Sequence, residues 1–251
     1  QYPIALAGVL RAGYVVVNVN PLYTPRELEH QLKDSGAEAI VILENFCTTL
    51  QQVIARTQVK HVVVASIGEM LGFPKGIIVN LVLRRVKKVV PEYSLPGHVK
   101  FVDAIDQGAR GKLAPVKLGP SDVAFLQYTG GTTGVSKGAT LTHRNLVANV
   151  LQLEAWVQPA LTDTTRGPVP EQLIYICALP LYHVFALTVN CLGGIRLGTL
   201  NVLITNPRDM KGFVAELAKY RFNVIPGVNT LFNALAENPE FQKLDFSSLR
   251  I

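Results

Sequence analysis

The sequence predicts an α/β fold made of two mainly parallel sheets, each flanked by helices. Short apolar runs alternate with segments of helical periodicity along most of the chain. Several of these runs, such as residues 62–64, are continuous, which is typical of strands covered on both faces. A charged fraction of 17% beside 49% hydrophobic residues indicates a large buried core. We expect a first subdomain over residues 1–165 and a second over residues 166–251.

The early part of the chain contains the clearest local signals. Thr24, Pro25 and Glu27 form a capping box with proline at the first helical position, and Gly36 is placed to end that helix. Further elements are expected at residues 3–12 (helix), 15–17 (strand), 39–43 (strand), 45–55 (helix capped by Asn45) and 61–65 (strand).

Residues 76–90 break this alternation. They combine an apolar start with a basic cluster formed by Arg84, Arg85, Lys87 and Lys88. As a helix, this segment would be basic and partly amphipathic, as are segments that contact an anionic membrane surface. A packed helix whose basic end complements its own dipole explains the same pattern. The sequence leaves both interpretations open.

The second half continues the α/β pattern. Thr142 is placed to cap a helix from residue 143, and Asn206, Pro207 and Asp209 resemble another helix start. Residues 185–200 are apolar, but glycines and polar residues interrupt them, so we expect a core helix and turn instead of a membrane span. The remaining expected elements are a linker at 111–121, strands at 122–126, 139–141, 173–179, 201–205 and 222–225, helices at 143–156 and 228–236, and an exposed loop at 158–171.

The most informative stretch is the glycine- and threonine-rich segment at residues 127–138. Glycine lets backbone N–H groups approach an anion closely, and successive N–H groups can form an anion-binding nest. Threonine and serine hydroxyls add donors, and Lys137 adds a mobile positive charge. The segment is not a Walker A loop, because Ser136 precedes the lysine and Gly138 follows it. It indicates polyphosphate binding, although a flexible surface loop has a similar composition.

Charge and cysteine content exclude several classes. A net charge of +6 suits anionic ligands or an anionic membrane, but it is too small and scattered to indicate nucleic-acid binding. The three cysteines, Cys47, Cys177 and Cys191, lack the spacing of a metal site or redox pair. We therefore expect buried free thiols in a reducing compartment, and no protein metal site.

Two further motifs accompany the glycine-rich stretch: Pro-Leu-Tyr-His-Val-Phe at residues 180–185 and Gly-Val-Asn-Thr-Leu at residues 227–231. Together the three resemble the adenylate-forming superfamily and, within it, bacterial long-chain fatty-acid–CoA ligases. Residues 18–27 and 204–209 resemble the same family, so the likeness covers essentially the whole chain. The family's Tyr-Gly-x-Thr-Glu stretch and its C-terminal domain are absent. The resemblance therefore implies an internal, incomplete part of the large N-terminal domain, inactive by itself.

The resemblance also implies a reaction. A long-chain fatty acid is converted to an acyl-adenylate and then to a coenzyme A thioester, with ATP, Mg²⁺ and coenzyme A taking part. Of the implied residues, Thr129, Lys137 and His183 are catalytic. His183 would position the acyl group and not act as a base, since a fatty carboxylate is already ionised near pH 7. The implied phosphate-binding residues are Thr129, Gly130, Gly131, Thr132, Thr133, Gly134 and Lys137, and the implied acyl-binding residues are Tyr182, His183, Gly227, Val228, Asn229 and Thr230.

Two alternatives stay open. An adenylating enzyme that loads a carrier protein would carry the same motifs in this region. A non-catalytic phosphate-binding or membrane-docking module would explain the loop and the basic cluster, but not the Tyr182-His183 pair. We expect a cytoplasmic protein with peripheral contact at the inner face of the cell membrane and no nucleic-acid partner, and a homodimer is compatible with the sequence.

Overall fold

The computed structural model describes residues 1–129 and 136–251. They divide into two compact units, Gln1–Leu141 and Thr142–Ile251. Every strand pair whose register is described is parallel, and helices lie between most strands that follow each other in the chain. The predicted α/β class with mainly parallel sheets is therefore confirmed. The subdomain boundary that we expect between residues 165 and 166 stays a prediction.

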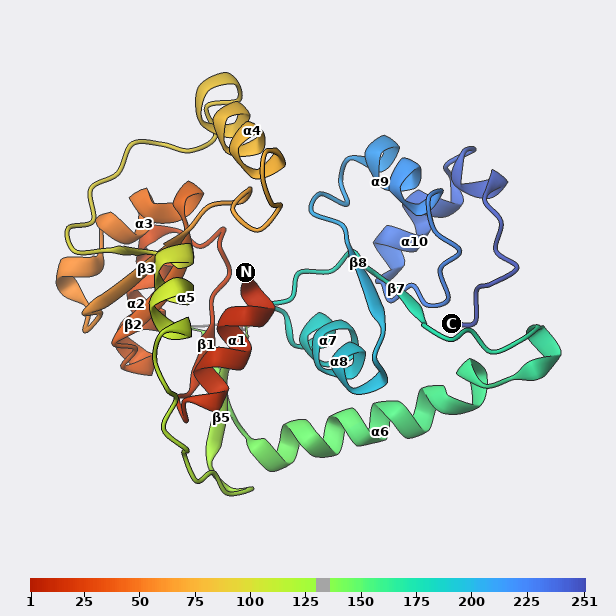
Figure 1. Cartoon of the computed structure of the whole chain (residues 1–251), viewed down its shortest axis with the longest axis horizontal. Coiled ribbons are helices and arrows are strands. Elements are labelled where there is room, and N and C mark those ends of the chain that lie inside the picture. The colour runs from red at the N-terminus through yellow and green to blue at the C-terminus, as the bar shows by residue number, and fades with distance from the viewer. Residues whose placement is uncertain (130–135) are drawn as a thin grey trace. The chain divides into compact units, whose positions relative to one another are not determined.

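The described strands of the first unit form two sheets, with strand orders β1-β5-β6 and β2-β3-β4. Figure 1 labels β1 and β5 of the first sheet and β2 and β3 of the second. We expected one sheet in this region; the strands separate because β1 pairs with β5, far along the chain, and not with β2. The elements are α1 (Tyr2–Arg11), β1 (Val16–Asn18), α2 (Pro25–Ser35), β2 (Ala39–Leu43), α3 (Cys47–Gln51), β3 (His61–Ala65), α4 (Lys75–Leu81), β4 (Val99–Lys100), α5 (Phe101–Ala109), β5 (Val123–Thr129) and β6 (Lys137–Thr142).

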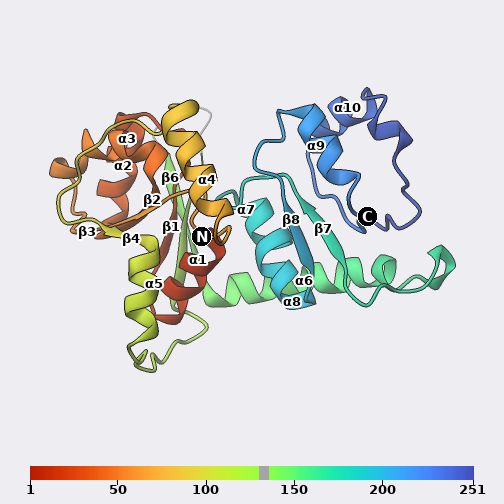
Figure 2. The same ribbon diagram turned by 45° about the horizontal axis from the view of Figure 1, so that its top comes forward.

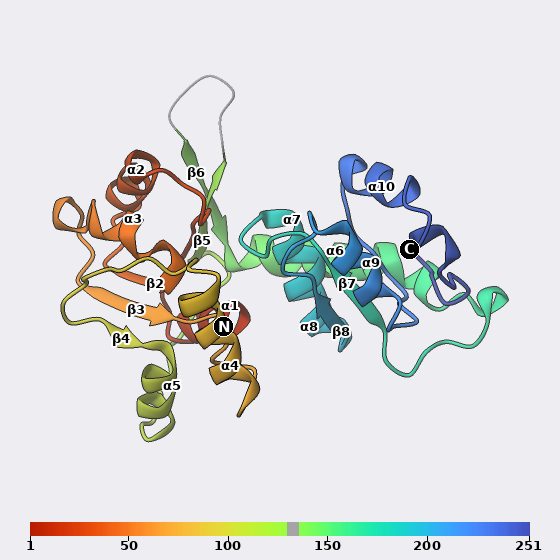
Figure 3. The same cartoon turned by 90° about the horizontal axis from the view of Figure 1, so that it is seen from above.

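Helix α2 has the boundaries that its sequence predicts. The Thr24 side chain accepts from the Glu27 backbone N–H, the Glu27 carboxylate accepts from the Thr24 backbone N–H, and Gly36 ends the helix with φ +65°. Leu28 and Leu32 are buried in a core that includes residues of β2, α3 and β3. With α3, α2 therefore covers one face of the β2-β3-β4 sheet (Figure 3).

The helix expected at residues 45–55 is broken in the structure. A 3₁₀ turn at Glu44–Phe46 precedes the short helix α3, and a second 3₁₀ turn occupies Ile54–Arg56. Asn45 does not cap α3, so that prediction is wrong. Its side-chain nitrogen instead donates to the Val89 carbonyl oxygen at 3.0 Å, a long-range bond that local sequence cannot indicate.

The segment expected at residues 76–90 is helical only in part. After α4 the chain winds as a π-helix over Val82–Val86, and it leaves helical structure before Pro91. In Figure 1, α4 lies at the margin of its unit.

The second unit is built around β7 and β8, which lie side by side (Figure 2). Helix α6 packs along α8: the Leu153 side chain lies against Gly193, and Glu154 accepts from Arg196 Nε at 2.9 Å. The elements are α6 (His143–Leu161), β7 (Ile174–Cys177), α7 (Val184–Ala186), a π-helix (Leu187–Leu192), α8 (Gly193–Leu197), β8 (Leu200–Leu203), α9 (Met210–Leu217) and α10 (Asn229–Ala236).

Three sequence-based boundaries in this unit need correction. Asn206 does not cap α9; Asp209 does, because its carboxylate accepts from the Gly212 backbone N–H at 3.1 Å. Helix α6 continues through Pro159 to Leu161, beyond the expected end. Residues 222–225 form no full strand, but Val224 makes an isolated parallel bridge to Tyr175.

The last residues of the chain are integrated into this unit. The backbone N–H groups of Arg250 and Ile251 both donate to the Asn223 carbonyl oxygen. The buried Arg250 guanidinium donates to three carbonyl oxygens on another loop, those of Asp163, Gly167 and Pro168. One arginine thus fixes a loop more than 80 residues earlier in the chain.

All three cysteines are buried free thiols, as predicted. Burial raises the pKa of the Cys47 thiol to about 11, with a smaller contribution from Glu44, and burial also raises that of Cys177 to about 11. These thiols are therefore protonated and unreactive near neutral pH. Among the described residues, no helix combines the length and hydropathy that a membrane span requires.

Candidate functional site

The ends of the predicted phosphate-binding loop are clearly placed. Thr129 is the exposed last residue of β5, and Lys137 is the exposed first residue of β6, the strand next to β5 in its sheet. The Ser136 hydroxyl donates to the Thr129 carbonyl oxygen at 2.7 Å and ties the two ends together. The predicted residues Gly130, Gly131, Thr132, Thr133 and Gly134 lie outside the described residues.

Helix α2 holds both sides of this loop base. His30 Nε2 donates to the Ser136 carbonyl oxygen at 3.0 Å, which requires a proton on that nitrogen. One turn further along α2, the Asp34 carboxylate accepts from the Tyr128 hydroxyl at 2.5 Å. Because residues four apart lie on the same helix face, a single face of α2 contacts the segments before and after the loop.

Gly138 completes this packing from β6. A Cβ atom at this position would lie 2.9 Å from the Tyr128 ring, closer than side-chain carbons normally approach. The glycine that follows Lys137 therefore has a steric role, because a Cβ atom there would collide with the tyrosine ring.

A buried polar network lies beneath the loop base. Tyr2 donates through its hydroxyl to Asn18 Oδ1 at 2.7 Å, and Asn18 Nδ2 donates to Gln127 Oε1 at 2.9 Å. Asn18 and Gln127 are direct register partners in β1 and β5. Gln31 of α2 joins the network by donating to the Asn18 backbone carbonyl at 2.7 Å. These hydrogen bonds between buried polar groups favour one geometry at the strand that leads into the loop, although Gln31 Oε1 has no partner among the described residues.

The electrostatics of this region suit an anion. Burial raises the pKa of the Tyr128 hydroxyl, and its hydrogen bond to Asp34 and the charge of that carboxylate raise it further, so the tyrosine stays a proton donor. The Lys137 ammonium is exposed, and no carboxylate in the described part of the chain pairs with it. Its charge is thus available to an anionic ligand.

His183, the predicted acyl-positioning residue, caps a helix in the second unit. Its Nδ1 accepts from the Phe185 backbone N–H at 3.3 Å, so the neutral ring carries its proton on Nε2. A turn precedes it, with the His183 N–H donating to the Pro180 carbonyl oxygen at 3.0 Å. The residue is exposed, and Tyr182 is half-buried. The π-helix that follows soon after is a feature often found at functional sites.

The other predicted acyl-binding residues lie at the start of α10. Gly227 is required sterically, because a Cβ atom there would lie 2.8 Å from the Phe232 ring. Val228 is the exposed N-cap residue, and Asn229 and Thr230 form the exposed first turn. These residues form the turn that leads into α10, and the side chains of Val228, Asn229 and Thr230 are exposed.

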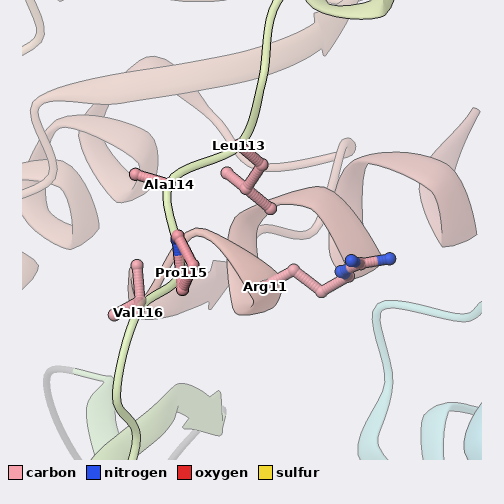
Figure 4. A pocket seen from close by; sticks show the side chains of 5 residues that line it. All are labelled: Arg11, Leu113, Ala114, Pro115 and Val116. Carbon is pink, nitrogen blue, oxygen red and sulfur yellow. The ribbon is translucent and has the colours of Figure 1, made fainter.

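The structure brings together the two ends of the predicted phosphate-binding loop in the first unit. The predicted acyl-binding residues belong to the second unit. A pocket of about 330 Å³ in the first unit includes none of them, since Arg11 and residues 113–116 line it (Figure 4). Within residues 1–129 and 136–251, no group of three His, Cys, Asp or Glu side chains could hold a metal ion.

Sequence reasoning missed three functional neighbours of the loop: His30, Gln31 and Asp34. Their partners lie 106, 13 and 94 residues away, so no local pattern connects them. One signal was available in the sequence. These three polar residues follow each other at helix positions i, i+1 and i+4, on a helix whose capping was already clear.

Comparison with known proteins decides the family. The profile described as AMP-binding enzyme matches residues 1–251. The chain belongs to the AMP-binding enzyme family. It is 57% identical to a long-chain-fatty-acid–CoA ligase of Escherichia coli O6:H1 and 55% identical to that of Yersinia pestis, over its whole length. A Bacillus subtilis enzyme of the same name is 33% identical. The chain spans only 43–44% of the length of these relatives.

Solved structures agree on the fold. A long-chain-fatty-acid–CoA ligase from Archaeoglobus fulgidus matches 94% of this AMP-binding family chain with a TM-score of 0.63 and 25% identity, over 40% of its own length. An anthranilate–CoA ligase, solved with anthranoyl-AMP, matches 98% with a TM-score of 0.72 and 19% identity, over 41% of its length. The predicted resemblance to fatty-acid–CoA ligases is confirmed, and the folds of these relatives extend well beyond the residues that match.

Proposed function

We propose that the chain is part of an enzyme that activates long-chain fatty acids with ATP and transfers the acyl group to coenzyme A. The observation that carries this proposal is the identity of 55–57% across the whole chain to several bacterial ligases of that name. In the first step the fatty carboxylate attacks the α-phosphorus of ATP, and pyrophosphate leaves. In the second step the coenzyme A thiol attacks the acyl carbon, AMP leaves, and the thiol proton is released.

Thr129 and Lys137 are proposed to hold the β- and γ-phosphates, together with residues 130–134. The exposed threonine stands at one end of the loop, and at the other stands an exposed ammonium that no carboxylate of the described residues pairs with; both support this assignment. Donors already held in position stabilise charge on a leaving pyrophosphate without reorganising during the reaction. The bonds from His30 and Asp34 supply that rigidity at the loop base.

His183, Tyr182 and residues 227–230 are proposed to contact the acyl group. The Nε2–H of the neutral His183 ring can donate a hydrogen bond, since Nδ1 is already occupied by the Phe185 N–H. A donor, not a base, is what an ionised fatty carboxylate requires. The exposed turn at residues 227–230 offers an apolar side chain, Val228, beside two polar ones.

The resemblance implies Mg²⁺, but the described residues do not provide a set of ligands for it. They contain no cluster of carboxylates, histidines or cysteines that would bind a divalent ion by themselves. We therefore assign it no ligand in this chain and no step in the reaction.

ATP–pyrophosphate exchange in the presence of a long-chain fatty acid tests the proposal. In the longer protein, Lys137→Met should lower kcat/KM for ATP by about 100-fold, since a charged donor to the phosphates is lost. Lys117→Met is the matched control, an exposed lysine in the linker, and should leave the rate unchanged. Exchange that persists in Lys137→Met at the native rate would refute the phosphate assignment.

Two related assays settle the remaining alternatives. The 251-residue chain alone should show no exchange, because the relatives are more than twice as long. Competition between coenzyme A and acyl carrier protein for the acyl-adenylate distinguishes the two acceptors, and we expect coenzyme A to receive the acyl group.

We also propose a cytoplasmic location with peripheral contact to an anionic membrane. Long-chain fatty acids partition into membranes, so such contact would place the enzyme near its substrate. A homodimer is a further proposal, tested by sedimentation of the longer protein. The net charge of +6 favours an anionic surface.

A further inference from the structure

Helix α4 is attached to the first unit by its polar side. Asn80 Oδ1 accepts from the Gly68 backbone N–H at 2.8 Å, and Asn80 Nδ2 donates to the Ser66 hydroxyl at 3.3 Å. One turn earlier, the buried Gly76 packs directly on the Gly68 backbone, with no room for a Cβ atom. The face that an ordinary surface helix fills with leucine and valine is here small and polar.

In the π-helix that follows α4, an ion pair between Arg84 and Glu44 attaches the same side of the segment to the unit. Arg84 Nη2 and Nε lie 2.6 and 3.1 Å from Glu44 Oε2, and Glu44 is only 3% exposed. Gly76, Asn80 and Arg84 follow each other at intervals of four, so they lie along one helix face. This face is fixed to the unit by hydrogen bonds and an ion pair.

The opposite side of α4 is apolar and exposed. Ile77, Ile78 and Leu81 are 63%, 56% and 57% exposed, and Phe73, just before the helix, is 88% exposed. No described residue covers them to the extent that a core position would be covered. The polarity of α4 is therefore inverted relative to a typical surface helix: its hydrogen bonds to the unit come from polar groups, and its most exposed side chains are apolar. Val79, Val82 and Leu83 are half-buried.

Exposed basic residues precede and follow these apolar residues in the sequence. Lys75, Arg85, Lys87 and Lys88 are all exposed, and residues 70–91 contain no Asp or Glu. Two copies of this surface would bring like charges together, which disfavours self-association. Apolar residues flanked by long basic side chains, whose charged ends reach phosphate groups while their stems stay in apolar surroundings, suit a lipid–water interface.

We propose that residues 70–89 form a docking surface for an anionic phospholipid membrane. Phe73, Ile77, Ile78 and Leu81 enter the interface, and Lys75, Arg85, Lys87 and Lys88 contact lipid phosphates. The polar face through Asn80 and Arg84 keeps the helix attached to the unit. This inference rests on the peripheral membrane contact proposed above, and it is independent of the ligase reaction because binding needs no substrate.

Vesicle co-sedimentation tests the proposal, with the 251-residue chain and with the longer protein. The vesicles contain phosphatidylcholine alone or with phosphatidylglycerol at about one third of the lipid. Two variants address the two parts of the surface: Arg85→Glu/Lys87→Glu/Lys88→Glu removes the charge complementarity, and Ile77→Ser/Ile78→Ser/Leu81→Ser removes the apolar part. Circular dichroism and thermal unfolding confirm that each variant folds.

Matched controls lie in exposed regions away from this surface. Lys112→Glu/Lys117→Glu reverses charge in the linker, and Val147→Ser/Leu151→Ser removes exposed apolar side chains from α6. We expect the charge-reversal variant to lose at least about 100-fold in partitioning to anionic vesicles, since each basic residue contributes about fivefold. The apolar variant should lose binding at all salt concentrations, and the controls should bind as the native chain does.

Three results would overturn the proposal. If the native chain does not bind anionic vesicles, the membrane contact itself fails, while ATP–pyrophosphate exchange still tests the ligase reaction. If the native chain binds and both segment variants bind equally well, another surface is responsible. The third result concerns Ile78→Cys, which adds one accessible thiol to a chain whose own cysteines are buried. If a fluorophore on that thiol is shielded in the longer protein without vesicles, the rest of that protein covers the segment.

Discussion

Two helices of the first unit, α2 and α4, have opposite polarity. Helix α2 buries Leu28 and Leu32 in the core and carries ion pairs on its outer face, including Lys33 with Glu29 at 2.6 Å. Helix α4 turns Asn80 inward and exposes Leu81. Polar contacts hold both helices to the unit, and α2 also buries two leucine side chains in the core.

The difference between α2 and α4 shows that the pattern of apolar residues in the sequence does not decide which face of a helix packs against the rest of its unit. In α2 the polar residues His30, Gln31 and Asp34 point toward partners in the neighbouring sheet and loop. In α4 and the π-helix after it, the polar residues Asn80 and Arg84 make the attachment, and the apolar side chains of Ile77, Ile78 and Leu81 stay exposed. The polar residues of α2 form hydrogen bonds at the base of the candidate site, whereas α4 exposes apolar side chains at the surface of its unit.

The sharpest test of this contrast is the same substitution in both helices. Leu32→Ala should lower the free energy of unfolding by about 3 kcal/mol, because it opens a cavity in a closely packed core. Leu81→Ala should change it by less than about 0.5 kcal/mol, since that side chain is mostly exposed. Urea unfolding of the two variants measures both values. Equal losses would show that α4 is buried in the same way as α2.

The second test breaks the polar attachment of α4. Arg84→Met should lower the free energy of unfolding by about 2 kcal/mol, because it leaves the buried Glu44 carboxylate without its partner. The double variant Arg84→Met/Glu44→Gln should regain part of the loss, since no unpaired charge remains. If the single variant is as stable as the native chain in urea unfolding, the ion pair does not hold this face.

The third test concerns the polar face of α2. In the longer protein, His30→Ala should raise KM for ATP about fivefold, the effect of one lost hydrogen bond, with KM for the fatty acid unchanged. His30→Gln should restore much of the affinity, because its amide can donate to the Ser136 carbonyl. His61→Ala, at an exposed position on β3, is the control. A loss of stability with no change in KM for ATP would show that His30 has only a structural role.

The smallest effect is expected on the outer face of α2. Arg56, and after it Lys33, hold the pKa of Glu29 at about 2 through hydrogen bonds and charge. A carboxyl whose pKa is lowered by folding stabilises the fold at pH values above its ordinary, unfolded-state pKa. That contribution is lost as the pH falls toward the folded-state pKa of about 2. The stability difference between the native chain and Glu29→Gln should therefore be constant above about pH 4.5 and shrink below it. Urea unfolding at several pH values measures this difference, and one that grows on acidification would contradict the assignment.

Local sequence signals were sufficient to predict helix ends that depend only on residues a few positions apart. The capping box at Thr24, the helix end at Gly36 and the cap at Thr142 are all present in the structure, because each depends on residues three or four positions apart. The start of α9 shows the limit of such signals. Asn206 instead accepts from the Arg208 backbone N–H at 3.3 Å, in a turn before the helix, and the nearby Asp209 is the cap.

The residues of the candidate site could be proposed from the sequence, but the contacts that support the loop base could not. The glycine-rich loop and Lys137 could be identified because their chemistry lies in consecutive residues. The contacts of His30 and Asp34 could not, since they join segments about 100 residues apart. The inverted polarity of α4 was equally hidden: periodicity shows that one face is apolar, and only the structure shows which way that face points.

The buried Arg250 has a practical consequence for dividing this protein into parts. Its guanidinium holds the carbonyl groups of residues 163–168, so a shorter version of the second unit that stops before it would release that loop. Limited proteolysis of such a version should cut first between residues 162 and 171. The two compact units could thus be expressed separately only if the second keeps Arg250 at its carboxyl end.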